Sequence, residues 1–178
     1  MIVTEGLIRS ELEVATSFVK SAFVDFMTPV IKTIKISHAR SFWGQIRSLG
    51  GNAFELKVSD VFNDIPNEEN AKRRFLGMLV HELLHTVNGC MNHGSRWKSL
   101  ANKVNALYPK LKVQRCTSMY EYGIKKDTSK FNYKITCHAC SNTFFRQRKS
   151  DTTDPVFLNT FCQCGKCGAR GKFEVIKI

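Results

Sequence analysis

The sequence predicts an α+β protein that consists of one ordinary domain followed by a small, cysteine-rich module. Residues 1–126 contain three amphipathic helical patterns, separated by segments in which apolar and polar residues alternate. Residues 127–178 instead show short β-like runs interleaved with Cys-x-x-Cys pairs. A chain of 178 residues is long enough for one domain and a small module, and we expect the boundary at 126/127.

The first half of the domain is predicted to form one helix and then strands. Apolar residues recur at steps of three and four over residues 5–27, which predicts a helix that ends before Pro29. Residues 30–47 have a β-like pattern, although the alternation is less regular toward the end. After a Gly-Gly-Asn turn signal, residues 54–58 alternate cleanly and predict a half-buried strand.

Two helices are predicted next. Asn67 is a good helix cap, and the helix that follows it should run to about Val87, before an Asn-Gly stop signal. A further helix is expected over residues 95–107, just before Pro109. The β-like runs of the module cover residues 131–136, 143–147, 156–161 and 173–178.

The charge of the chain is strongly positive and unevenly distributed. There are 27 Lys and Arg against 15 Asp and Glu, so 27 − 15 gives +12. Residues 109–178 hold 14 basic and 5 acidic residues, and 14 − 5 gives +9. This concentration predicts a surface that binds a polyanion, with DNA as the expected partner.

The expected cellular location follows from the apolar segments, the N-terminal sequence and the cysteines. No run approaches 18 apolar residues, so no membrane-spanning helix is expected, and the start lacks the pattern of a secretory signal. Seven cysteines in such a chain are expected to be reduced and to bind metal rather than form disulfides. We therefore expect a cytoplasmic protein, associated with the nucleoid if it binds DNA, and a monomer.

A His-Glu-Leu-Leu-His motif lies in the predicted helix after Asn67. Four residues of helix bring His81 and His85 onto one face, about one turn apart, so that both imidazoles can bind one Zn²⁺. Glu82 is rotated by about 100° around the axis. It is therefore not a ligand from the same face, but it can reach water at the metal and act as a general base.

A third histidine completes this candidate site. His93 lies eight residues after His85, beyond the Asn-Gly break, where the chain can fold back. Three protein ligands leave one coordination position open, which is the catalytic rather than the structural arrangement of zinc. His38 has no visible partner and is interpreted as structural, and Trp97 is interpreted as a packing residue.

The cysteines of the module predict a second, structural zinc site. Cys137 and Cys140 form one Cys-x-x-Cys pair, and 23 residues separate it from the pair Cys164 and Cys167. Two such pairs with β-like arms are typical of a zinc ribbon. Cys162 competes with Cys164 for the third position, and the glycines after Cys164 favour Cys164 because they allow a tight turn. The other side chains expected to bind no metal are Cys90, Cys116, Cys162 and His138.

Together these motifs resemble the SprT-like metalloprotease family, also called the Spartan type. The likeness is carried by the His-Glu-Leu-Leu-His motif, by His93-Gly94-x-x-Trp97, by Trp43-Gly44 and by the terminal ribbon. The loop from His85 to His93 is short, as in small bacterial and phage members. The chain also ends at the ribbon, without a long recruitment tail.

The resemblance implies a compact zincin-type fold with a catalytic zinc held by three histidines. On this chain the ligands are then His81, His85 and His93, and Glu82 is the base. Members of the Spartan branch cleave proteins that are bound or crosslinked to DNA. The resemblance thus implies a protein or peptide substrate and two zinc ions, one catalytic and one structural.

Further residues are candidates for substrate and DNA contacts. The strand that carries Phe54, Leu56 and Val58 is expected to pair with an extended peptide if its edge is free. An oxyanion donor is required as well. The choice stays open among Tyr120, Tyr122 and Arg115, and a structural role is the simpler interpretation of each.

In the module, Arg146 and Arg148 alternate on a predicted strand and so should share one face. They are candidates to bind phosphates, although an exposed basic face is the simpler interpretation.

The function predicted from the sequence is therefore zinc-dependent peptide hydrolysis, directed at proteins associated with DNA. One alternative is a nucleic-acid-binding zinc-ribbon protein whose zincin part is inactive or regulatory. The presence of Glu82 argues against it, because a scaffold has no use for the base. Another alternative is a metallopeptidase that acts on free proteins.

Overall fold

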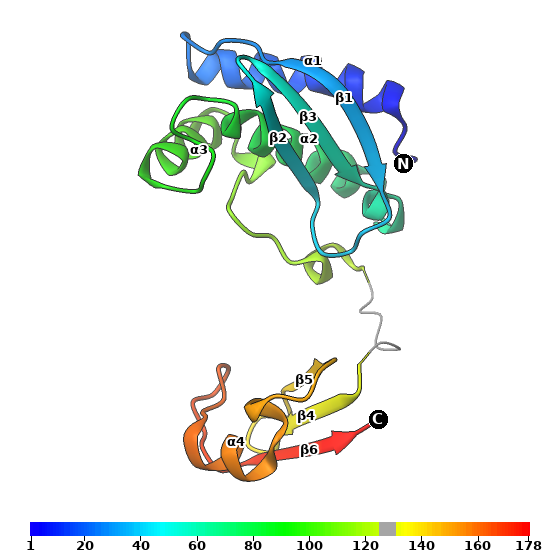
Figure 1. The fold of residues 1–178 in the computed structure, drawn as a ribbon, viewed down its shortest axis with the longest axis vertical. Helices are drawn as coiled ribbons and strands as arrows, with labels where there is room; N and C mark the ends of the chain where they lie inside the picture. Colours follow the sequence, from blue (N-terminus) through cyan, green and yellow to red (C-terminus); the bar gives the residue numbers. More distant parts are fainter. Residues whose placement is uncertain (125–130) are drawn as a thin grey trace. The chain divides into compact units, whose positions relative to one another are not determined.

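The computed structural model describes residues 1–124 and 131–178, apart from the side chain of Tyr120. The chain divides into two compact units, Met1–Ile124 and Lys125–Ile178. The boundary expected at 126/127 falls in the segment 125–130, outside the described residues. Helices and two small sheets are both present, so the protein is α+β, as the sequence predicts (Figure 1).

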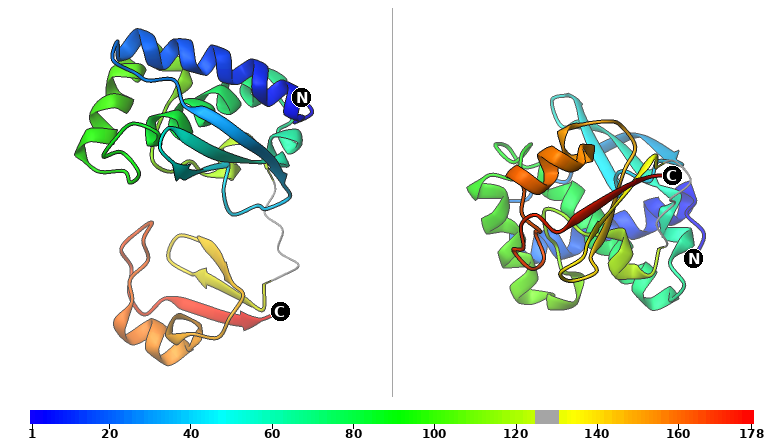
Figure 2. Two further views of the ribbon diagram at one scale, coloured as in Figure 1. Left: turned by 45° about the horizontal axis from the view of Figure 1, so that its top comes forward. Right: turned by 90° about the horizontal axis from the view of Figure 1, so that it is seen from below.

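Unit 1 is a three-stranded sheet with helices packed on one face (Figures 1 and 2). Helix α1 (Glu5–Ala22) comes first, and the strands are β1 (Val30–Ser37), β2 (Gly44–Gly50) and β3 (Ala53–Ser59). Helices α2 (Glu68–His85) and α3 (Ser95–Leu107) follow. Single-turn 3-10 helices complete the unit: η1 (Asp60–Asp64), η2 (Pro109–Leu111) and η3 (Met119–Tyr122).

The sheet is mixed, and β3 is its central strand. The strand order is β1-β3-β2, with β1 parallel and β2 antiparallel to β3. The prediction that the strand of Phe54, Leu56 and Val58 offers a free edge is therefore wrong. Period-two alternation shows that one face of a strand is buried, but it does not show which neighbours the strand has. The edges belong to β1 and β2.

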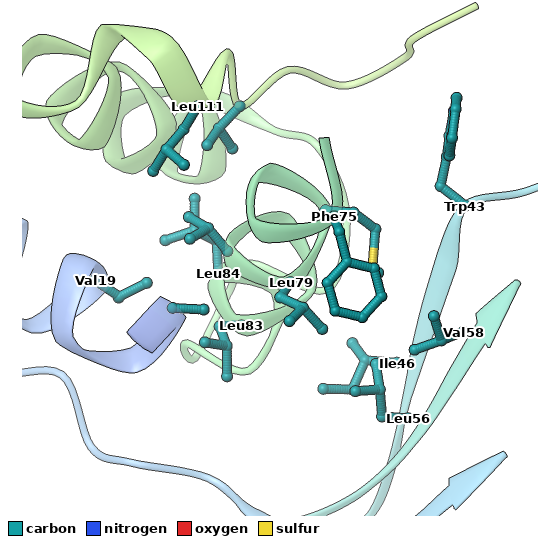
Figure 3. Close-up of a cluster of buried hydrophobic side chains, with 14 of the residues drawn as sticks. Val19, Trp43, Ile46, Leu56, Val58, Phe75, Leu79, Leu83, Leu84 and Leu111 are labelled. Carbon is teal, nitrogen blue, oxygen red and sulfur yellow. The ribbon is translucent and has the colours of Figure 1, made fainter. Parts of the chain in front are cut away.

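The core of unit 1 lies around α2. Figure 3 shows Phe75 and Leu79 of α2 toward Ile46, Leu56 and Val58 of the sheet, while Leu83 and Leu84 lie nearer Val19 of α1. All of these side chains are buried. Because α2 is covered by the sheet and by α1, its direction and rotation are fixed by apolar packing on several sides.

The ends of the helices follow from local chemistry. The Thr4 hydroxyl accepts from the Leu7 N–H at 3.2 Å, and the Asn67 side chain accepts from the Asn70 N–H at 2.8 Å, which confirms the predicted cap of α2. The first helix is shorter than predicted, since it ends at Ala22. The chain becomes extended at Phe23, and this turn toward the sheet buries Phe26.

The predicted β-like stretch 30–47 is in fact two strands with a connection over residues 38–43. His38 lies in this connection and does have a partner, because its Nδ1 lies 2.5 Å from Asp60 Oδ2. Arg40 bonds the other oxygen of the same carboxylate at 2.6 Å. This hydrogen bond at the end of β1 agrees with a structural role for His38.

Unit 2 contains a second three-stranded sheet and one short helix. Strands β4 (Tyr133–Cys137), β5 (Thr143–Arg146) and β6 (Phe173–Lys177) are antiparallel in the order β5-β4-β6. A 3-10 turn, η4 (Asp151–Thr153), precedes helix α4 (Pro155–Phe161), which packs beside β6 (Figure 2). The core is small and consists of Ile135, Cys137, Leu158, Cys164 and Phe173.

The predicted strand over residues 156–161 is wrong, because this segment is helix α4. Asp154 caps the helix by accepting from the N–H groups of Val156 and Phe157 at 2.9 and 3.0 Å. Pro155 occupies the first helical position, where its missing N–H costs nothing. The Asp-Pro pair is thus a helix start, and it outweighs the weak β-like alternation that follows.

Candidate metal centres

The described residues contain a group of three histidines whose ring nitrogens converge on one point. Helix α2 carries His81 and His85 on successive turns, and His93 approaches from the loop before α3. The Nε2 atom of His81 lies 3.2 Å from that of His85 and 3.0 Å from that of His93, and the third distance is 3.2 Å. Nitrogens bound to one tetrahedral zinc at 2.0–2.1 Å lie about 3.3 Å apart, so the spacing fits this metal.

Backbone carbonyl groups fix the orientation of two of the rings. Nδ1 of His81 lies 3.0 Å from the Gln114 carbonyl oxygen, and Nδ1 of His85 lies 2.6 Å from that of Cys90. Because a carbonyl oxygen can only accept, each Nδ1 carries the proton, and in a neutral ring each Nε2 then presents a lone pair. Two lone pairs that face each other at 3.2 Å need a cation between them.

That cation is better supplied by a metal than by protons. Burial, together with the neighbouring His85, lowers the pKa of His81 to about 3. Burial is also the largest cause of the lowered pKa of His85 and of His93. All three rings are therefore neutral at neutral pH, the state in which imidazole binds metal.

Trp97 is the packing residue that the sequence predicts, and its contacts hold the cluster. Its indole is 2% exposed and lies against all three imidazoles, with centroid distances of 4.7 Å to His81, 5.6 Å to His85 and 4.7 Å to His93. A rigid aromatic wall of this kind restricts the rotation of each ring.

Glu82 lies beside the histidines but belongs to no metal-ligand group among the described residues. Its side chain is buried, and this burial raises the pKa of the carboxyl group to about 7. A hydrogen bond from the Ile46 backbone N–H and the charge of Arg74 act in the opposite direction. A carboxyl group with a pKa near neutrality can both accept and release a proton at that pH.

The backbone of β2 approaches this carboxyl group closely. A Cβ atom on Gly44 would lie 3.1 Å from Glu82 Cγ and would overlap the sulfur atom of Met78. Only glycine allows the edge strand to lie so near α2 at this position. In the sequence, Gly44 was notable only as part of the Trp43-Gly44 likeness to the SprT-like family. Its neighbours along the chain do not show the contact with Met78 and Glu82, which lie more than thirty positions away.

A pocket of about 290 Å³ opens beside the cluster. Besides His81, His93 and Glu82, its lining includes two cations, Arg74 and Arg115. A second pocket, of about 700 Å³, includes His85 and the far end of β2 near Ser48 and Asn52. Both ends of the edge strand thus face a cavity that reaches the histidines.

The structure places the candidates for an oxyanion donor differently relative to the histidines. Arg115 lines the smaller pocket, and its charge contributes to the lowered pKa of His93, so it lies near the cluster. Tyr122 packs edge-on against Trp43, with ring centroids 5.7 Å apart. The side chain of Tyr120 lies outside the described part of the chain.

Unit 2 brings together the four cysteines that the sequence predicts. The Sγ atoms of Cys137 and Cys167 are 3.8 Å apart, and those of Cys140 and Cys164 are 3.7 Å apart. Sulfur atoms on one tetrahedral zinc, at 2.3 Å each, are separated by about 3.8 Å. Cys162 is not part of the group, and His138 turns toward Glu174, so neither competes for the metal. The cluster is compatible with a zinc ribbon.

The two candidate DNA contacts do not lie on one strand. Strand β5 ends at Arg146, and Arg148 lies beyond it, so the expectation that both residues share a strand face is wrong. The Arg146 guanidinium group lies 5.2 Å from the centre of the Phe144 ring. Arg146 and Phe144, but not Arg148, line a groove of about 690 Å³ that also includes Lys166 and Phe173.

No protein-family model matches the chain. None of the helices in the described ranges is both long and apolar enough to cross a membrane.

Proposed function

We propose that this protein is a zinc-dependent metallopeptidase of the SprT-like family, with a zincin-type fold in unit 1 and a zinc ribbon in unit 2. The observation that carries the proposal is the position of Glu82. Its carboxyl group is buried, has a pKa raised to about 7 and lies beside three convergent imidazoles without joining them as a ligand. A structural zinc site has no use for such a group.

Each residue of the site has a defined task in this reaction. His81, His85 and His93 would hold the metal, which would supply Lewis acidity and lower the pKa of water in the site. Glu82 accepts a proton from the attacking water and later delivers it to the leaving amine nitrogen. Arg115 lines the pocket and is the side chain that we assign to stabilise the oxyanion.

The edge of β2 is the proposed binding surface for the substrate backbone. The Trp43 carbonyl oxygen accepts from the Ser59 N–H at 2.9 Å, so alternate residues of β2 from there on bond to β3. The N–H and C=O groups of Gly44 and Ser48 and the C=O group of Ile46 then point away from β3, whereas the Ile46 N–H donates to Glu82. An extended peptide can pair with the groups that Glu82 does not occupy, and its side chains can enter the pockets at both ends of β2.

Proteins bound to DNA are the proposed substrates, because unit 2 contains a basic groove with aromatic walls. Phe144 and Phe173 offer ring surfaces, and Arg146 and Lys166 offer charge. This combination suits single-stranded nucleic acid, in which bases stack and phosphates pair with cations. The excess of +9 over residues 109–178, from 14 − 5, acts in the same direction.

The proposal is tested with the variant Glu82→Gln. The variant should retain two zinc ions per chain, measured by elemental analysis, but hydrolyse an unstructured fluorogenic peptide about 10²–10⁴-fold more slowly. The exposed Glu69 on the same helix provides the matched control, and Glu69→Gln should leave the rate unchanged. A Glu82→Gln variant as active as the native protein would show that this site is not a peptidase centre.

A second candidate function is nucleic-acid binding by the ribbon with a regulatory, non-hydrolytic unit 1. The groove of Phe144 and Arg146 favours it, since this groove does not depend on the histidines. Cleavage of a DNA-binding protein, measured with and without single-stranded DNA, separates the candidates. Stimulation by DNA supports the first function. Cleavage without stimulation indicates a peptidase for free proteins, and DNA binding without any cleavage indicates the second function.

A further inference from the structure

Arg74 is a buried cation inside unit 1 that the proposed reaction does not use. Its side chain is 5% exposed, and neither Nε nor Nη1 has a hydrogen-bond partner. Buried guanidinium groups are costly unless their N–H groups are paired. In the sequence, Arg74 is one of several basic residues on a predicted helix, and nothing there indicates that its side chain is buried.

The protein compensates the charge of Arg74 only in part. The Cζ atom lies 4.7 Å from the centre of the Trp43 ring, a cation–π contact. Glu121 and Glu82 stabilise the charge from a distance, since neither of them forms an ion pair with Arg74. Burial lowers the pKa of Arg74 to about 10, so the group stays charged at neutral pH. Nε and Nη1 are buried as well as unpaired, so a ligand can reach this guanidinium only from the side on which it lines a pocket.

Arg74 lines the pocket of about 290 Å³ beside the histidines, and Arg115 is a second cation in its lining. Glu82 is the one acidic side chain among the described residues that line this pocket. The larger pocket differs, because its lining carries one acid, Asp25, and one arginine, Arg96. The electrostatic preference for an anion is therefore confined to the pocket at the Gly44 end of β2.

The place of Arg74 on α2 indicates which part of a substrate it can reach. It precedes His81 by seven residues, which corresponds to about 10 Å along the helix axis. Its side chain also slants toward the start of the helix, away from the imidazoles. A group bound there is too far from the histidines to be the carbonyl under attack, but it lies within reach of a neighbouring side chain of the same peptide.

We propose that this pocket is a specificity site for an acidic substrate residue next to the scissile bond, with Arg74 binding its carboxylate. The inference rests on the proposed peptidase function and adds a substrate class to it. A carboxylate can accept two parallel N–H groups from one guanidinium, and a pair that includes Nη2 would satisfy one of the two unpaired donors of Arg74, Nε or Nη1. Arg115 at the exposed side of the pocket would add attraction for the same charge.

The test compares two peptides that differ at one position. Each has an otherwise uncharged sequence, with a single Glu in one and a single Gln in the other. The zinc-loaded full-length protein should cleave the Glu peptide with a kcat/KM about tenfold to a hundredfold higher, as expected for hydrogen bonds to a charged group. Mass spectrometry should map the preferred cleavage to a bond that adjoins the Glu residue.

Variants on α2 connect the preference with Arg74. Arg74→Met should reduce the ratio of the two kcat/KM values to about one, and Arg74→Lys should leave an intermediate ratio, because lysine keeps the charge but not the paired donors. The neighbouring Arg73 donates to Asn70 instead, and Arg73→Met should keep the native ratio. If Arg74→Met does not fold, Arg74→Lys against Arg73→Met decides the question.

A binding measurement provides a readout that does not need turnover. Calorimetric titration of zinc-loaded Glu82→Gln should show tighter binding of the Glu peptide than of the Gln peptide, and Arg74→Lys in that background should reduce the difference. Equal cleavage of both peptides by the native protein overturns the specificity site but leaves the peptidase function standing. If the protein with two zinc ions cleaves neither peptide, the peptidase function fails and the inference fails with it.

Discussion

Glu82 is held by the fold in a position where its charge is unfavourable. Its carboxyl group is packed between α2 and the edge strand, with Ile46 and Arg74 as its compensating partners. The proposed base therefore destabilises the folded protein when it is ionised, since an apolar or amide side chain would be easier to bury. Function and stability oppose each other at this one residue.

Because the charge of Glu82 is unfavourable in the folded state, the stabilities of the native protein and of Glu82→Gln should differ in a pH-dependent way once a chelator has removed any metal. The folded pKa of Glu82 is about 7, above the 4.5 of a free glutamate side chain, so its favourable contribution holds below pH 4.5 and is lost as the pH rises through 7. The shift of 7 − 4.5 corresponds to about 3 kcal/mol. At pH 8, metal-free Glu82→Gln should therefore unfold at a higher urea concentration than the metal-free native protein.

At pH 5 the two proteins should differ little, because Glu82 is protonated in the folded state. The histidines titrate in both proteins and cancel in the comparison. Urea denaturation, followed by circular dichroism at both pH values, measures the difference. A stability gap that does not change between pH 5 and pH 8 would contradict the raised pKa.

At the residue scale, the metal ligands could be predicted because their spacing along the chain reflects local geometry. A turn of helix relates His81 to His85, and a tight turn relates Cys164 to Cys167. Arg74 and Gly44 could not be recognised in the same way. Their roles depend on contacts between α2 and the chain around the start of β2. Arg74 of α2 contacts Trp43, and Gly44 of β2 lies against Met78 and Glu82 of α2.

Helix α2 is the element that joins the site to the core. The face with His81, Glu82 and His85 carries the residues of the proposed reaction, and Phe75, Leu79 and Leu83 fill the interior (Figure 3). Its glycine, Gly77, lies against the backbone of η2, where an added Cβ would overlap the Leu111 carbonyl oxygen. The position of the helix thus depends on the absence of one methyl group.

Gly77→Ala should destabilise unit 1, although alanine favours a helix by about 1 kcal/mol over glycine. The clash is with backbone atoms, which cannot rotate away, so α2 or η2 must shift at a cost of about 1–3 kcal/mol or more. The thermal midpoint of unit 1 should fall, and zinc affinity should fall with it.

Gly6 in α1 provides the comparison for this substitution. A Cβ there meets nothing within 4 Å, so Gly6→Ala should be neutral or stabilising by less than about 1 kcal/mol. Equal effects of the two substitutions would show that the contact between Gly77 and Leu111 does not constrain the helix.

Prediction of whole elements succeeded where the pattern was long and failed where it was short. The helices α2 and α3 are long, and Asn67 caps the start of α2, so the starts of both helices were predictable to the residue. Seven residues of α4 are too few to show a helical period, and only the Asp-Pro start distinguishes them from a strand. The neighbours of β3 depend on contacts between distant segments, which a periodicity does not encode.

On the scale of the whole molecule, each of the two units has its own ligand group. Unit 2 has only a few apolar core residues, and two of its core positions are the cysteines Cys137 and Cys164. A core of this size does not stabilise a fold unaided, so a metal bound by the four cysteines would have to supply much of the folding free energy.

Replacing Cys137 and Cys140 with serine should therefore remove one zinc ion and unfold unit 2 alone. Hydrolysis of an unstructured peptide by unit 1 should persist, because its ligands are untouched. Elemental analysis and amide hydrogen exchange measure the two effects. Cys162→Ser serves as the control and should retain both metal ions. Loss of both zinc ions in the double variant would contradict independent sites.

The basic groove predicts a salt-dependent affinity for DNA. Arg146→Glu together with Arg148→Glu should weaken binding to any labelled single strand and flatten the dependence on salt, because fewer counterions are released. Arg146→Glu alone should account for most of the loss, since Arg146 lines the groove with Phe144 and Arg148 lies beyond β5. Fluorescence anisotropy at several salt concentrations measures both quantities.

A charge-matched control uses two exposed lysines of unit 1. Lys20→Glu with Lys103→Glu changes the net charge by the same amount but should retain most of the affinity. Equal losses in the two double variants would mean that total charge, rather than the groove, attracts DNA.

The two tryptophans of the chain both stand at the proposed catalytic centre. Trp97 touches the three imidazoles, and Trp43 lies under the guanidinium of Arg74. The intrinsic emission of the protein is therefore a built-in optical reporter with two separable signals. Paramagnetic cobalt in place of zinc should quench Trp97, and an acidic peptide should perturb Trp43. One label-free spectrum can then follow metal loading and substrate capture in the same sample.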